Sequence, residues 1–430
     1  MKAKYRLDTE ENYRFLELEA KKLFDFGKKF PSPGGSSYWL GDDGTPWAQY
    51  PRETWITARM VHVYSIGSML GYEECMEPAV QGVEGLLNEL RDSQNGGWYT
   101  GIRADGSVEA DKQCYAHAFV MLAASSALLA GFEKADELLE KAEEIFIRKF
   151  WDDGCGLTYD TWDIPFHNLS PYRGLNANMH TVEAFLALSD ATGDSAWRER
   201  AGRIITHVLK WAEANEWRIP EHYTDQWKPE LMYNEHKPDD PFKPFGATPG
   251  HGIEWARLIA QHALASYSEN KNTNGCMISQ EGTKRIGQAE LLYQRAIQDG
   301  WNADGKEGIV YTTDWTGAPV IHDRMHWTIA EALNTSASLY HITGKEIYAE
   351  DYSRFLKYTD DMVIDHKNGS WYHQLDSNNQ ILSSVWPGKP DLYHAFQAML
   401  MSRYQPDNSI ASAVKRRKRY YAQNQSGTLN

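Results

Sequence analysis

Two kinds of helical segment alternate along this chain, and the alternation limits the folds that it can adopt. Hydrophobic periodicity predicts about twelve helices, over roughly residues 8–29, 53–71, 75–93, 112–130, 133–149, 176–192, 195–214, 250–269, 284–300, 325–343, 346–362 and 391–403. The odd-numbered segments are amphipathic: in the first, Leu16, Ala20 and Phe24 belong to one apolar stripe, and charged residues occupy the opposite face. The even-numbered segments are apolar nearly all round, which is typical of helices buried on every side. The sequence therefore predicts an inner and an outer layer of helices.

The even-numbered helices carry polar, reactive side chains near their N-terminal ends. The residues at these positions are Arg59, Tyr115, His117, His180, Glu183, His251, Glu254, Arg324, His326, Glu331 and His394. If the buried helices form a ring, these groups would meet at one end of it. The pattern therefore predicts a polar pocket lined by histidine, arginine and glutamate.

The connections between helices also alternate. Most connections out of an even-numbered helix are short and contain a glycine, as tight helix–helix turns do. Connections into these helices are far longer than usual, and four contain a segment typical of a β-hairpin, at 96–108, 154–163, 308–320 and 369–381. From six such helix pairs we expect an all-α fold, an (α/α)6 barrel with short β-hairpins in the long loops at one end. An open solenoid is the alternative, but it does not need a ring of polar groups.

No linker or break in composition divides the 430 residues, of which 42% are hydrophobic and 24% are charged. We therefore expect one barrel domain over residues 1–410 and a polar, basic tail over 411–430. The run Lys415–Arg419 stands beside a polar end, which is more typical of a solvated tail than of a nucleic-acid patch. The formal net charge of −15 also argues against nucleic acid and anionic membranes as partners.

The cysteines and the N-terminal sequence indicate a compartment. Cys75, Cys114, Cys155 and Cys276 are scattered, without the close pairs of a zinc site or the pattern of a disulfide framework. The N-terminal sequence lacks the apolar region of a signal peptide, and the most apolar stretch, 114–131, contains a histidine and several serines. We therefore expect a cytoplasmic protein without a membrane span, either a monomer or a homo-oligomer.

Aromatic residues are frequent in the long loops, which hold many of the 16 tryptophans. Sugars present flat C–H faces that pack on aromatic rings, and their hydroxyl groups need polar partners. Histidine, arginine and glutamate in the predicted pocket would supply such partners. Tryptophan also fills large cores between helices and hairpins, and that explanation is at least as good for any single tryptophan. For the whole set, we favour a small sugar as the ligand.

The predicted pocket is richer in histidine than in carboxylates, whereas glycosidases need two carboxylates flanking the scissile bond. Two histidines suit proton transfer near neutral pH, because imidazole can take up a proton and imidazolium can return it. HTVE at 180–183 and HGIE at 251–254 each place a histidine and a glutamate on one helical face. Their order reverses the E-x-x-H of di-metal carboxylate sites. We expect no metal, and, without a dinucleotide fingerprint, no cofactor.

Several longer segments resemble a known family. They are WITARMVHVYS (55–65), GGWY (96–99), KQCYAHAF (112–119), RGLNANMHTVEAFL (173–186), EHYTDQW (221–227), FGATPGHGIEWARL (245–258), GIVYTTDW (308–315) and VWPGKPDLYH (385–394). Through these segments the chain resembles the N-acylglucosamine 2-epimerase superfamily, and most of all its aldose–ketose isomerase branch, which includes mannose isomerase and sulfoquinovose isomerase-like enzymes. The resemblance covers nearly the whole chain and implies the same (α/α)6 barrel.

The resemblance also implies roles for individual residues. His251 and His394 match the two acid/base histidines of the family; we expect His394 to take the C2 proton and His251 to assist ring opening. Arg59 matches the arginine at the reacting end of the sugar. The other matches are positions expected to contact the sugar: Trp55, Tyr115, Asn176, His180, Glu254, Trp327 and Trp386.

The activity that the resemblance implies is interconversion of D-mannose and D-fructose, and also of D-lyxose and D-xylulose, by histidine-mediated proton transfer through a cis-enediol. A sugar 2-epimerase of the mannose/glucose, cellobiose or N-acylglucosamine type is one alternative, since it uses the same two histidines. A sulfoquinovose isomerase is another, although Pro390 and His373 occupy places where that branch is expected to carry glutamines. A sugar-binding protein without catalysis is the alternative from a different class.

Overall fold

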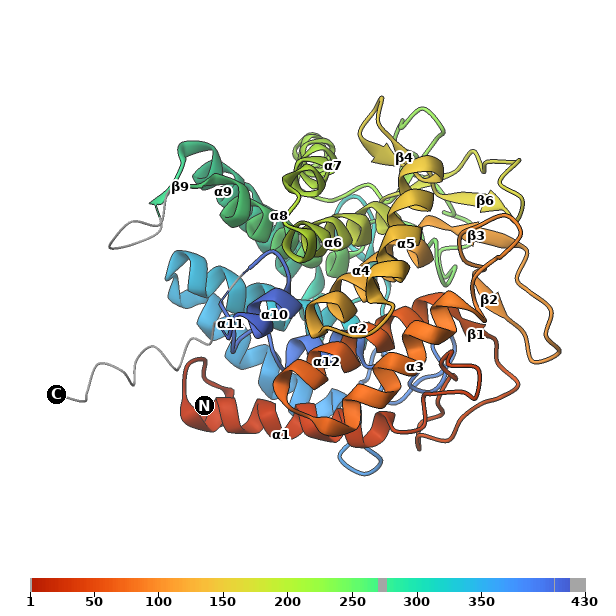
Figure 1. Ribbon diagram of the computed structural model, residues 1–430. Coiled ribbons are helices and arrows are strands. Elements are labelled where there is room, and N and C mark those ends of the chain that lie inside the picture. The colour runs from red at the N-terminus through yellow and green to blue at the C-terminus, as the bar shows by residue number, and fades with distance from the viewer. Residues whose placement is uncertain (1, 270–276, 406, 418–430) are drawn as a thin grey trace.

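The computed structural model describes residues 2–269, 277–405 and 407–417, and helices dominate this part of the chain (Figure 1). Six helices form an inner set: α2 (Thr54–Leu70), α4 (Cys114–Ala130), α6 (Leu175–Thr192), α8 (Pro249–Tyr267), α10 (His326–Thr343) and α12 (Tyr393–Ala398). Six lie outside them: α1 (Glu10–Gly27), α3 (Met76–Leu87), α5 (Ala135–Lys149), α7 (Ser195–Ala214), α9 (Gln280–Gly300) and α11 (Glu346–Tyr358). The two sets alternate along the chain, as the sequence predicts.

Contacts between neighbouring helices close the inner set into a ring. α2 contacts α4, α4 contacts α6, and the series continues through α8 and α10 to α12, which returns to α2. Each outer helix packs mainly on one inner helix: α3 on α2, α5 on α4, α7 on α6, α9 on α8, α11 on α10, and α1 on α12. α3 and α7 also contact the next inner helix, α4 and α8 respectively. This arrangement is an (α/α)6 barrel, and the expected fold class is confirmed.

The two layers differ in burial as their sequences predict. In α4 every residue from Ala116 to Ala127 is buried, because an apolar surface on all sides has neighbours on all sides. In α5 only one stripe, which includes Leu138, Ala142 and Phe146, is buried in this way. The turn after α4 contains Gly131 at φ 82°, a left-handed conformation that glycine adopts without strain. The expected glycine-containing turn is therefore present at this helix end.

Short strands join the long loops to one another at one end of the barrel, at the right of Figure 1. The extended segment before an inner helix pairs, antiparallel, with the loop of the next helix pair. These pairs are β1 (Arg52–Glu53) with β2 (Gly101–Ile102), β3 (Asp111–Gln113) with β6 (Thr161–Asp163), β7 (Arg173–Gly174) with β8 (His222–Tyr223), and β13 (Arg324–Met325) with β14 (Gln374–Leu375). Before α8 the contact is a single bridge between Ala247 and Thr313. Before α12 it is a hydrogen bond from the Lys389 N–H to the Leu40 carbonyl at 2.8 Å. The pairing fixes where each inner helix begins.

Other strand pairs form hairpins within one loop. They are β4 (Trp151–Asp152) with β5 (Leu157–Thr158), β9 (Ser268–Glu269) with β10 (Met277–Ile278), and β11 (Thr312–Thr313) with β12 (Pro319–Ile321). The hairpin expected at 308–320 is therefore confirmed as β11–β12. Segments 96–108 and 369–381 fold back through single bridges and pair mainly with neighbouring loops.

The hairpin expected at 154–163 is wrong. The turn lies earlier, where the Asp152 carboxylate accepts a hydrogen bond from the Gly154 N–H at 2.9 Å. Leu157–Thr158 consequently pairs back with β4, and Thr161–Asp163 pairs with β3 of the preceding loop. A pairing partner in another loop is not visible in the local sequence pattern.

Three helix boundaries also differ from the prediction. α3 ends at Leu87 rather than near residue 93, and α12 occupies only Tyr393–Ala398 of the predicted 391–403. The helix expected over 346–362 consists of α11 followed by a π-helical turn, Thr359–Val363. These differences lie mainly at C-terminal ends, although the outer helix α9 begins at Gln280, four residues before its predicted start. Every inner helix begins within two residues of its predicted start, so the polar residues there keep their predicted places.

A short helix lies beyond residue 410, where the sequence predicts a solvated tail. α13 (Ile410–Lys415) contacts α2, α4 and α6, and its side chains from Ile410 to Val414 are buried. Burial of this apolar segment extends the packed part of the chain past the expected boundary. The basic run Lys415–Arg419 is described only as far as residue 417.

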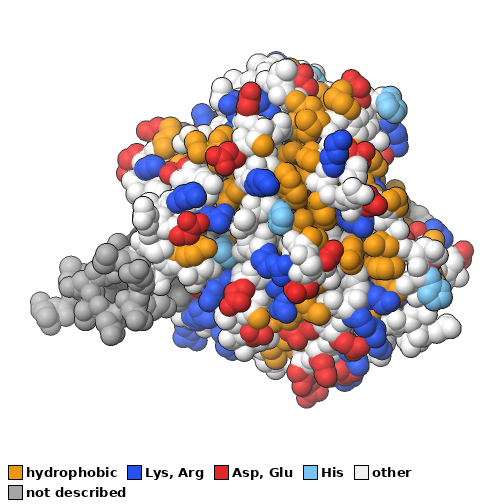
Figure 2. Space-filling view, turned by 90° about the horizontal axis from the view of Figure 1, so that it is seen from above, with side chains coloured by type: hydrophobic (Ala, Val, Ile, Leu, Met, Phe, Trp, Pro, Cys, Tyr) orange, Lys and Arg blue, Asp and Glu red, His pale blue; other side chains and the backbone are white. Residues whose placement is uncertain are grey.

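Further expectations concern the cysteines and the surface. Cys75 and Cys114 are buried and Cys155 is half-buried, all three as free thiols, while Cys276 lies outside the described residues. Among the described residues, no helix is long and apolar enough to cross a membrane. On the face shown in Figure 2, acidic and basic side chains are interspersed around a band of hydrophobic ones.

Candidate active site

The N-terminal ends of the inner helices bring the predicted site residues to the strand-bearing end of the barrel. The residues are Trp55 and Arg59 on α2, Tyr115 on α4, Asn176 and His180 on α6, His251 and Glu254 on α8, Trp327 on α10, Trp386 in the loop before α12, and His394 on α12. All the helical ones lie in the first two turns of their helices. Since the strand pairs fix the helix starts, they also fix the relative positions of these side chains.

Trp327 is a common neighbour of the two histidines predicted to transfer protons. Its ring centroid lies 5.0 Å from that of His251 and 6.0 Å from that of His394. Gly250 leaves space for this ring at the start of α8, because a Cβ at that position would lie 2.5 Å from it. The fold therefore places His251 and His394 around one aromatic side chain.

A carboxylate holds each of these histidines by the same ring nitrogen. Nδ1 of His251 lies 3.0 Å from Oε2 of Glu221, and Nδ1 of His394 lies 3.1 Å from Oε1 of Glu331. Because a carboxylate accepts hydrogen bonds, it favours the tautomer with the proton on Nδ1. Nε2 of each imidazole then has its lone pair free for proton transfer.

Burial keeps several site histidines neutral. It lowers the pKa of His394 well below the usual range, and the positive charge of nearby Arg59 adds to the shift. It also lowers the pKa of His180 to about 4, against the opposing hydrogen bond with Glu183. His251 is more exposed than His394, with 14% of its side-chain surface accessible against 5%. His394 is therefore an unprotonated base near neutral pH, and His251 lies nearer to solvent.

Arg59 is buried and fixed at both ends of its guanidinium group. Nη1 donates to Oδ2 of Asp391 at 3.1 Å, and Nη2 donates to the Tyr115 hydroxyl at 2.8 Å. The guanidinium carbon also lies over the rings of Phe119, at 4.4 Å, and Tyr393, at 4.8 Å. One carboxylate partner and several aromatic faces hold a cation that is poorly solvated at this place.

Aromatic rings connect this arginine to the rest of the predicted site. Trp55 lies edge-on to Trp386, with centroids 6.1 Å apart, and to Tyr115, at 6.4 Å. Tyr115 is in turn 5.2 Å from the ring of His180. Trp386 also stacks on Trp39 at 6.3 Å. The structure thus brings together the tryptophans expected to contact a sugar and the polar groups expected to bind its hydroxyls.

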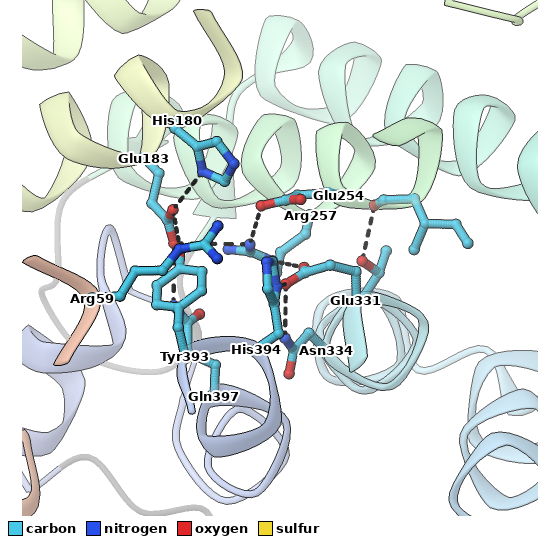
Figure 3. Close-up of polar contacts among 12 residues, drawn as sticks. Arg59, His180, Glu183, Glu254, Arg257, Glu331, Asn334, Tyr393, His394 and Gln397 are labelled. Carbon is cyan, nitrogen blue, oxygen red and sulfur yellow. Dashed lines mark hydrogen bonds and ion pairs between the residues drawn. The ribbon is translucent and has the colours of Figure 1, made fainter. Parts of the chain in front are cut away.

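A buried carboxyl network surrounds Arg257 behind the histidines (Figure 3). Nε of Arg257 donates to Glu331 at 2.8 Å, and Nη2 donates to Glu254 at 3.3 Å. Glu183 lies on the same guanidinium at 3.9 Å and accepts a hydrogen bond from the Tyr393 hydroxyl. The network extends to His394 through Glu331, so Arg257 helps to orient that imidazole.

The three carboxyl groups of this network cannot all be ionised at equal cost beside one arginine. Burial raises the pKa of Glu254 well above its usual range, and the neighbouring Glu331 adds to that shift. Burial alone would also raise the pKa of Glu183, but hydrogen bonds from His180 and Tyr393 and the charge of Arg257 lower it. Burial also raises the pKa of Glu331, although the charge of Arg257 and hydrogen bonds from Arg257 and Asn334 oppose that shift. The pKa is raised furthest for Glu254, which is therefore the most readily protonated of the three.

The same residues include a group with the spacing of metal ligands. Ligand atoms of His180, Glu183 and Glu254 all lie within 4.8 Å of one another. Without a cation other than Arg257, burial raises the pKa of Glu254, so a metal ion would have to displace a proton from it. Arg257 moreover already supplies positive charge to both carboxyl groups. The chemistry of these residues suits an arginine-centred network better than a metal site.

A sequence model described as N-acylglucosamine 2-epimerase (GlcNAc 2-epimerase) matches residues 34–398, most of the chain. The chain belongs to the N-acylglucosamine 2-epimerase family. The match extends over all six inner helices of the barrel and over every residue of the predicted site. The family resemblance expected from the sequence is therefore confirmed.

Individual members of the family are similar over nearly their whole length. A D-mannose isomerase of Pseudomonas cannabina pv. alisalensis is 38% identical over 409 residues, which cover 95% of this chain and 96% of the relative. A D-mannose isomerase of Thermobifida fusca is also 38% identical, over 403 residues that cover 93% and 96%. A crystal structure of D-mannose isomerase superposes with a TM-score of 0.83 at 27% identity, covering 90% of this chain and 97% of that one.

Two carboxylates of this N-acylglucosamine 2-epimerase family site were not predicted from the sequence. Glu221 holds His251 and Asp391 holds Arg59, and both residues lie outside the inner helices. Both lie in segments that carry the family resemblance, EHYTDQW and VWPGKPDLYH, and this was the only indication in the sequence that they are near the site. Helical spacing, however, cannot show which side chain a loop residue reaches.

Asn176 has an unsatisfied oxygen at the predicted site. Its Oδ1 is buried and finds no hydrogen-bond partner among the described residues. Asn176 lies four residues before His180 on α6, so the two side chains share a helical face. Because a buried acceptor without a partner costs free energy, a hydroxyl group of a ligand would stabilise this side chain.

Proposed function

We propose that this protein is a cofactor-independent aldose–ketose isomerase that interconverts D-mannose and D-fructose. The observation that carries the proposal is the pair of imidazoles, His251 and His394, each held through Nδ1 by its own carboxylate around Trp327. The two D-mannose isomerases that are 38% identical over nearly the whole chain support the choice of sugar. Aldose and ketose have the same oxidation state, so the reaction needs no external electron acceptor.

The first chemical task is to open the sugar ring. A closed pyranose has no acidic C–H bond, so the C1–O5 bond must break before C2 can lose a proton. The O1 proton must leave and O5 must gain a proton, and the aldehyde then forms at C1. We assign both transfers to Nε2 of His251, which takes the proton from O1 and passes it to O5, because His251 is the more exposed of the two histidines and Glu221 holds its Nδ1.

The second task is to move a proton from C2 to C1. Nε2 of His394 takes the C2 proton, and the electron pair of that bond forms the C1–C2 double bond of a cis-enediol whose O1 carries negative charge. O2 passes its proton to O1, the same imidazole returns its proton to C1, and the carbonyl forms at C2. Glu331 supports both transfers, because its carboxylate, hydrogen-bonded to Nδ1, stabilises the imidazolium that His394 becomes between them.

The third task is to stabilise negative charge on the oxygen atoms of the enediol. Arg59 supplies a guanidinium that is fixed by Asp391 and Tyr115 before the substrate arrives. A preorganised cation in a poorly solvated site stabilises developing charge without reorganisation. Trp55, Trp327 and Trp386 provide apolar surfaces for the sugar, and Asn176, His180 and Glu254 provide polar partners.

The test is to incubate the purified protein with D-mannose and to identify the product by chromatography and NMR. The proposal predicts that D-mannose gives D-fructose and that D-fructose, supplied alone, gives D-mannose. Glucose as the main product would assign the protein to the 2-epimerases instead. Tight binding of mannose without conversion would make it a sugar-binding protein.

A further inference from the structure

Two completely buried lysines lie just outside the proposed site. Lys112 precedes α4, and its Nζ donates to Oδ2 of Asp92 at 2.7 Å and to the Gly96 carbonyl at 2.6 Å. Lys389 precedes α12, and its Nζ donates to Oδ2 of Asp365 and to the Gly369 carbonyl, both at 2.7 Å, and also to the Asp42 carbonyl, in the loop before α2, at 2.9 Å. Each lysine thus binds one turn of the loop that follows an outer helix. We call these two contacts the lysine clasps.

The turns held by the clasps are built in the same way. Asp92 and Asp365 each begin the sequence D-x-x-N-G. In the first, Oδ1 of Asp92 accepts from the Asn95 N–H at 3.1 Å, and Oδ2 accepts from the Asn95 side chain at 2.9 Å. The corresponding distances from Asp365 to Asn368 are 3.0 and 2.9 Å. The clasps are therefore repeated units, one on each side of α2.

The clasped segments carry the two hydrogen-bond partners of Arg59. Tyr115 follows Lys112 by three residues, and Asp391 follows Lys389 by two. The Tyr115 hydroxyl and the Asp391 carboxylate bind Nη2 and Nη1 of Arg59, respectively. The helices that they belong to or precede, α4 and α12, both contact α2, which carries Arg59. Because each clasp holds the segment that carries one of these partners, it also fixes the position of one end of the Arg59 guanidinium group.

We propose that Lys112 and Lys389 are positioning residues that orient Arg59 by holding Tyr115 and Asp391. The inference rests on the proposed function, in which Arg59 stabilises the enediol oxygens. It explains why charged groups are buried here at all: ion pairs buried in a fold can often be replaced by apolar residues without loss of stability. Each lysine donates to two acceptors on its turn, a carboxylate and a carbonyl, which fixes its segment in direction as well as in distance.

A similar buried contact, made by an arginine, provides a comparison; we call it the arginine clasp. Before α10, Arg324 donates to both oxygens of Asp304, at 2.7 and 3.0 Å. The segment after it carries Trp327 rather than a hydrogen-bond partner of Arg59. Loss of this clasp can alter activity, but its effect should be independent of the bond between Tyr115 and Arg59.

The test is a double-mutant cycle on the first clasp. The neutral pair Lys112→Met/Asp92→Asn removes both charges, and Tyr115→Phe removes the hydroxyl that binds Arg59. We expect the neutral pair to lower kcat on the order of ten- to a hundredfold, with a smaller change in KM, because the misplaced group acts in the transition state. Combined with Tyr115→Phe, it should add little further loss, since both changes release the same end of Arg59.

Lys389→Met/Asp365→Asn combined with Asp391→Asn is the equivalent cycle for the second clasp. Arg324→Met/Asp304→Asn is the matched comparison, and its effect should multiply with that of Tyr115→Phe. Leu138→Ala, in the buried stripe of α5, controls for lost stability: it should lower the unfolding temperature and leave kcat unchanged. An unchanged kcat in the neutral pairs, or full multiplication of their effects with those of their partners, would overturn the proposal.

A crystal structure of the Lys112→Met/Asp92→Asn variant separates this proposal from the proposed function. We expect Nη2 of Arg59 to move out of hydrogen-bond distance of Tyr115, whatever the enzyme catalyses. If wild-type protein fails to convert mannose, the proposed function is wrong, but the displacement still tests the clasp. An undisplaced Arg59 contradicts the clasp even in an active isomerase. If the Met variant does not fold, Asp92→Asn alone serves for both measurements.

Discussion

At the scale of single residues, the proposed proton transfer depends on which nitrogen of each histidine is free. Glu221 and Glu331 each contact Nδ1, so Nε2 is the nitrogen available to a substrate in both rings. Burial of His394 keeps its imidazole unprotonated, and Glu331 is ready to stabilise the imidazolium. A single buried histidine can thus act first as a base and then as an acid without help from bulk water.

The first prediction concerns these two imidazoles. His394→Asn should reduce kcat by at least about a thousandfold, because asparagine retains a polar group of similar size but cannot transfer a proton. His251→Asn should reduce turnover of the closed sugar strongly, since ring opening precedes the transfer. Steady-state kinetics with D-mannose measure both effects, and circular dichroism checks that the fold persists. A His394→Asn enzyme with substantial activity and unchanged KM would remove His394 from its assigned role.

The second prediction concerns metal ions. Because Arg257 supplies positive charge to Glu183 and Glu254, activity should survive exhaustive treatment with EDTA. Residual metal can be measured by elemental analysis of the same sample. Loss of activity on chelation, with recovery on addition of one divalent ion, would contradict the proton-transfer scheme and favour a metal-assisted hydride shift.

Helical periodicity indicated which residues on the inner helices lie at the proposed site, but not which loop residues contact them. His251 and His394 stand at the starts of inner helices after long loops, and the barrel brings both to Trp327. Glu221 and Asp391 received no role, because a loop residue has no periodicity that shows its direction. The protonation pattern around Arg257 was also not predictable, since it depends on contacts between three different helices.

At the scale of elements, strand pairs between successive loops decide where the inner helices begin. The helix pattern was predictable because burial on one side or on all sides leaves a different periodicity in the sequence. The pairing of Thr161–Asp163 with β3, and of β13 with β14, was not predictable, because strands of two or three residues carry little signal of their own. Short α12 and the π-helical turn after α11 likewise result from packing rather than from local propensity.

The third prediction concerns α13, which packs on three inner helices. Val414→Asp should lower the free energy of unfolding by about 3 kcal/mol or more, because a buried carboxylate without a partner is strongly destabilising. Lys415→Asp, at the exposed end of the same helix, is the control and should change it little. Chemical denaturation measures both variants. Equal, small effects at the two positions would show that α13 does not contribute to the stability of the barrel.

At the scale of the whole molecule, the barrel buries many histidines in neutral form. Burial lowers the pKa of several to about 4: His62, His180, His262 and His326. In the unfolded chain these groups titrate near 6.5. At these histidines the unfolded state therefore binds more protons than the folded state between these values, whereas Glu254, with its raised pKa, contributes a difference of the opposite sign.

The fourth prediction follows from this difference. Stability should be full above about pH 6.5 and should fall as the pH decreases towards 4, by up to about 1.4 kcal/mol per pH unit for each such histidine. Urea denaturation at a series of pH values measures this slope. His262→Asn, far from the proposed chemistry, should reduce the slope by about one proton. A free energy of unfolding that stays constant from pH 7 to 5 would contradict the neutral, buried histidines.

The fate of the C2 proton is the most direct test of proton transfer by His394. When D-mannose is converted in D₂O, fructose should carry deuterium at C1, at less than one full equivalent, because the proton on buried His394 can return before it exchanges with solvent. Glucose should form only slowly, since epimerisation requires protonation of C2 from the opposite face. NMR of the early products measures both. Deuterated glucose as the main early product, or fructose that gains no solvent deuterium even after many turnovers at equilibrium, would contradict proton transfer by His394 between C2 and C1.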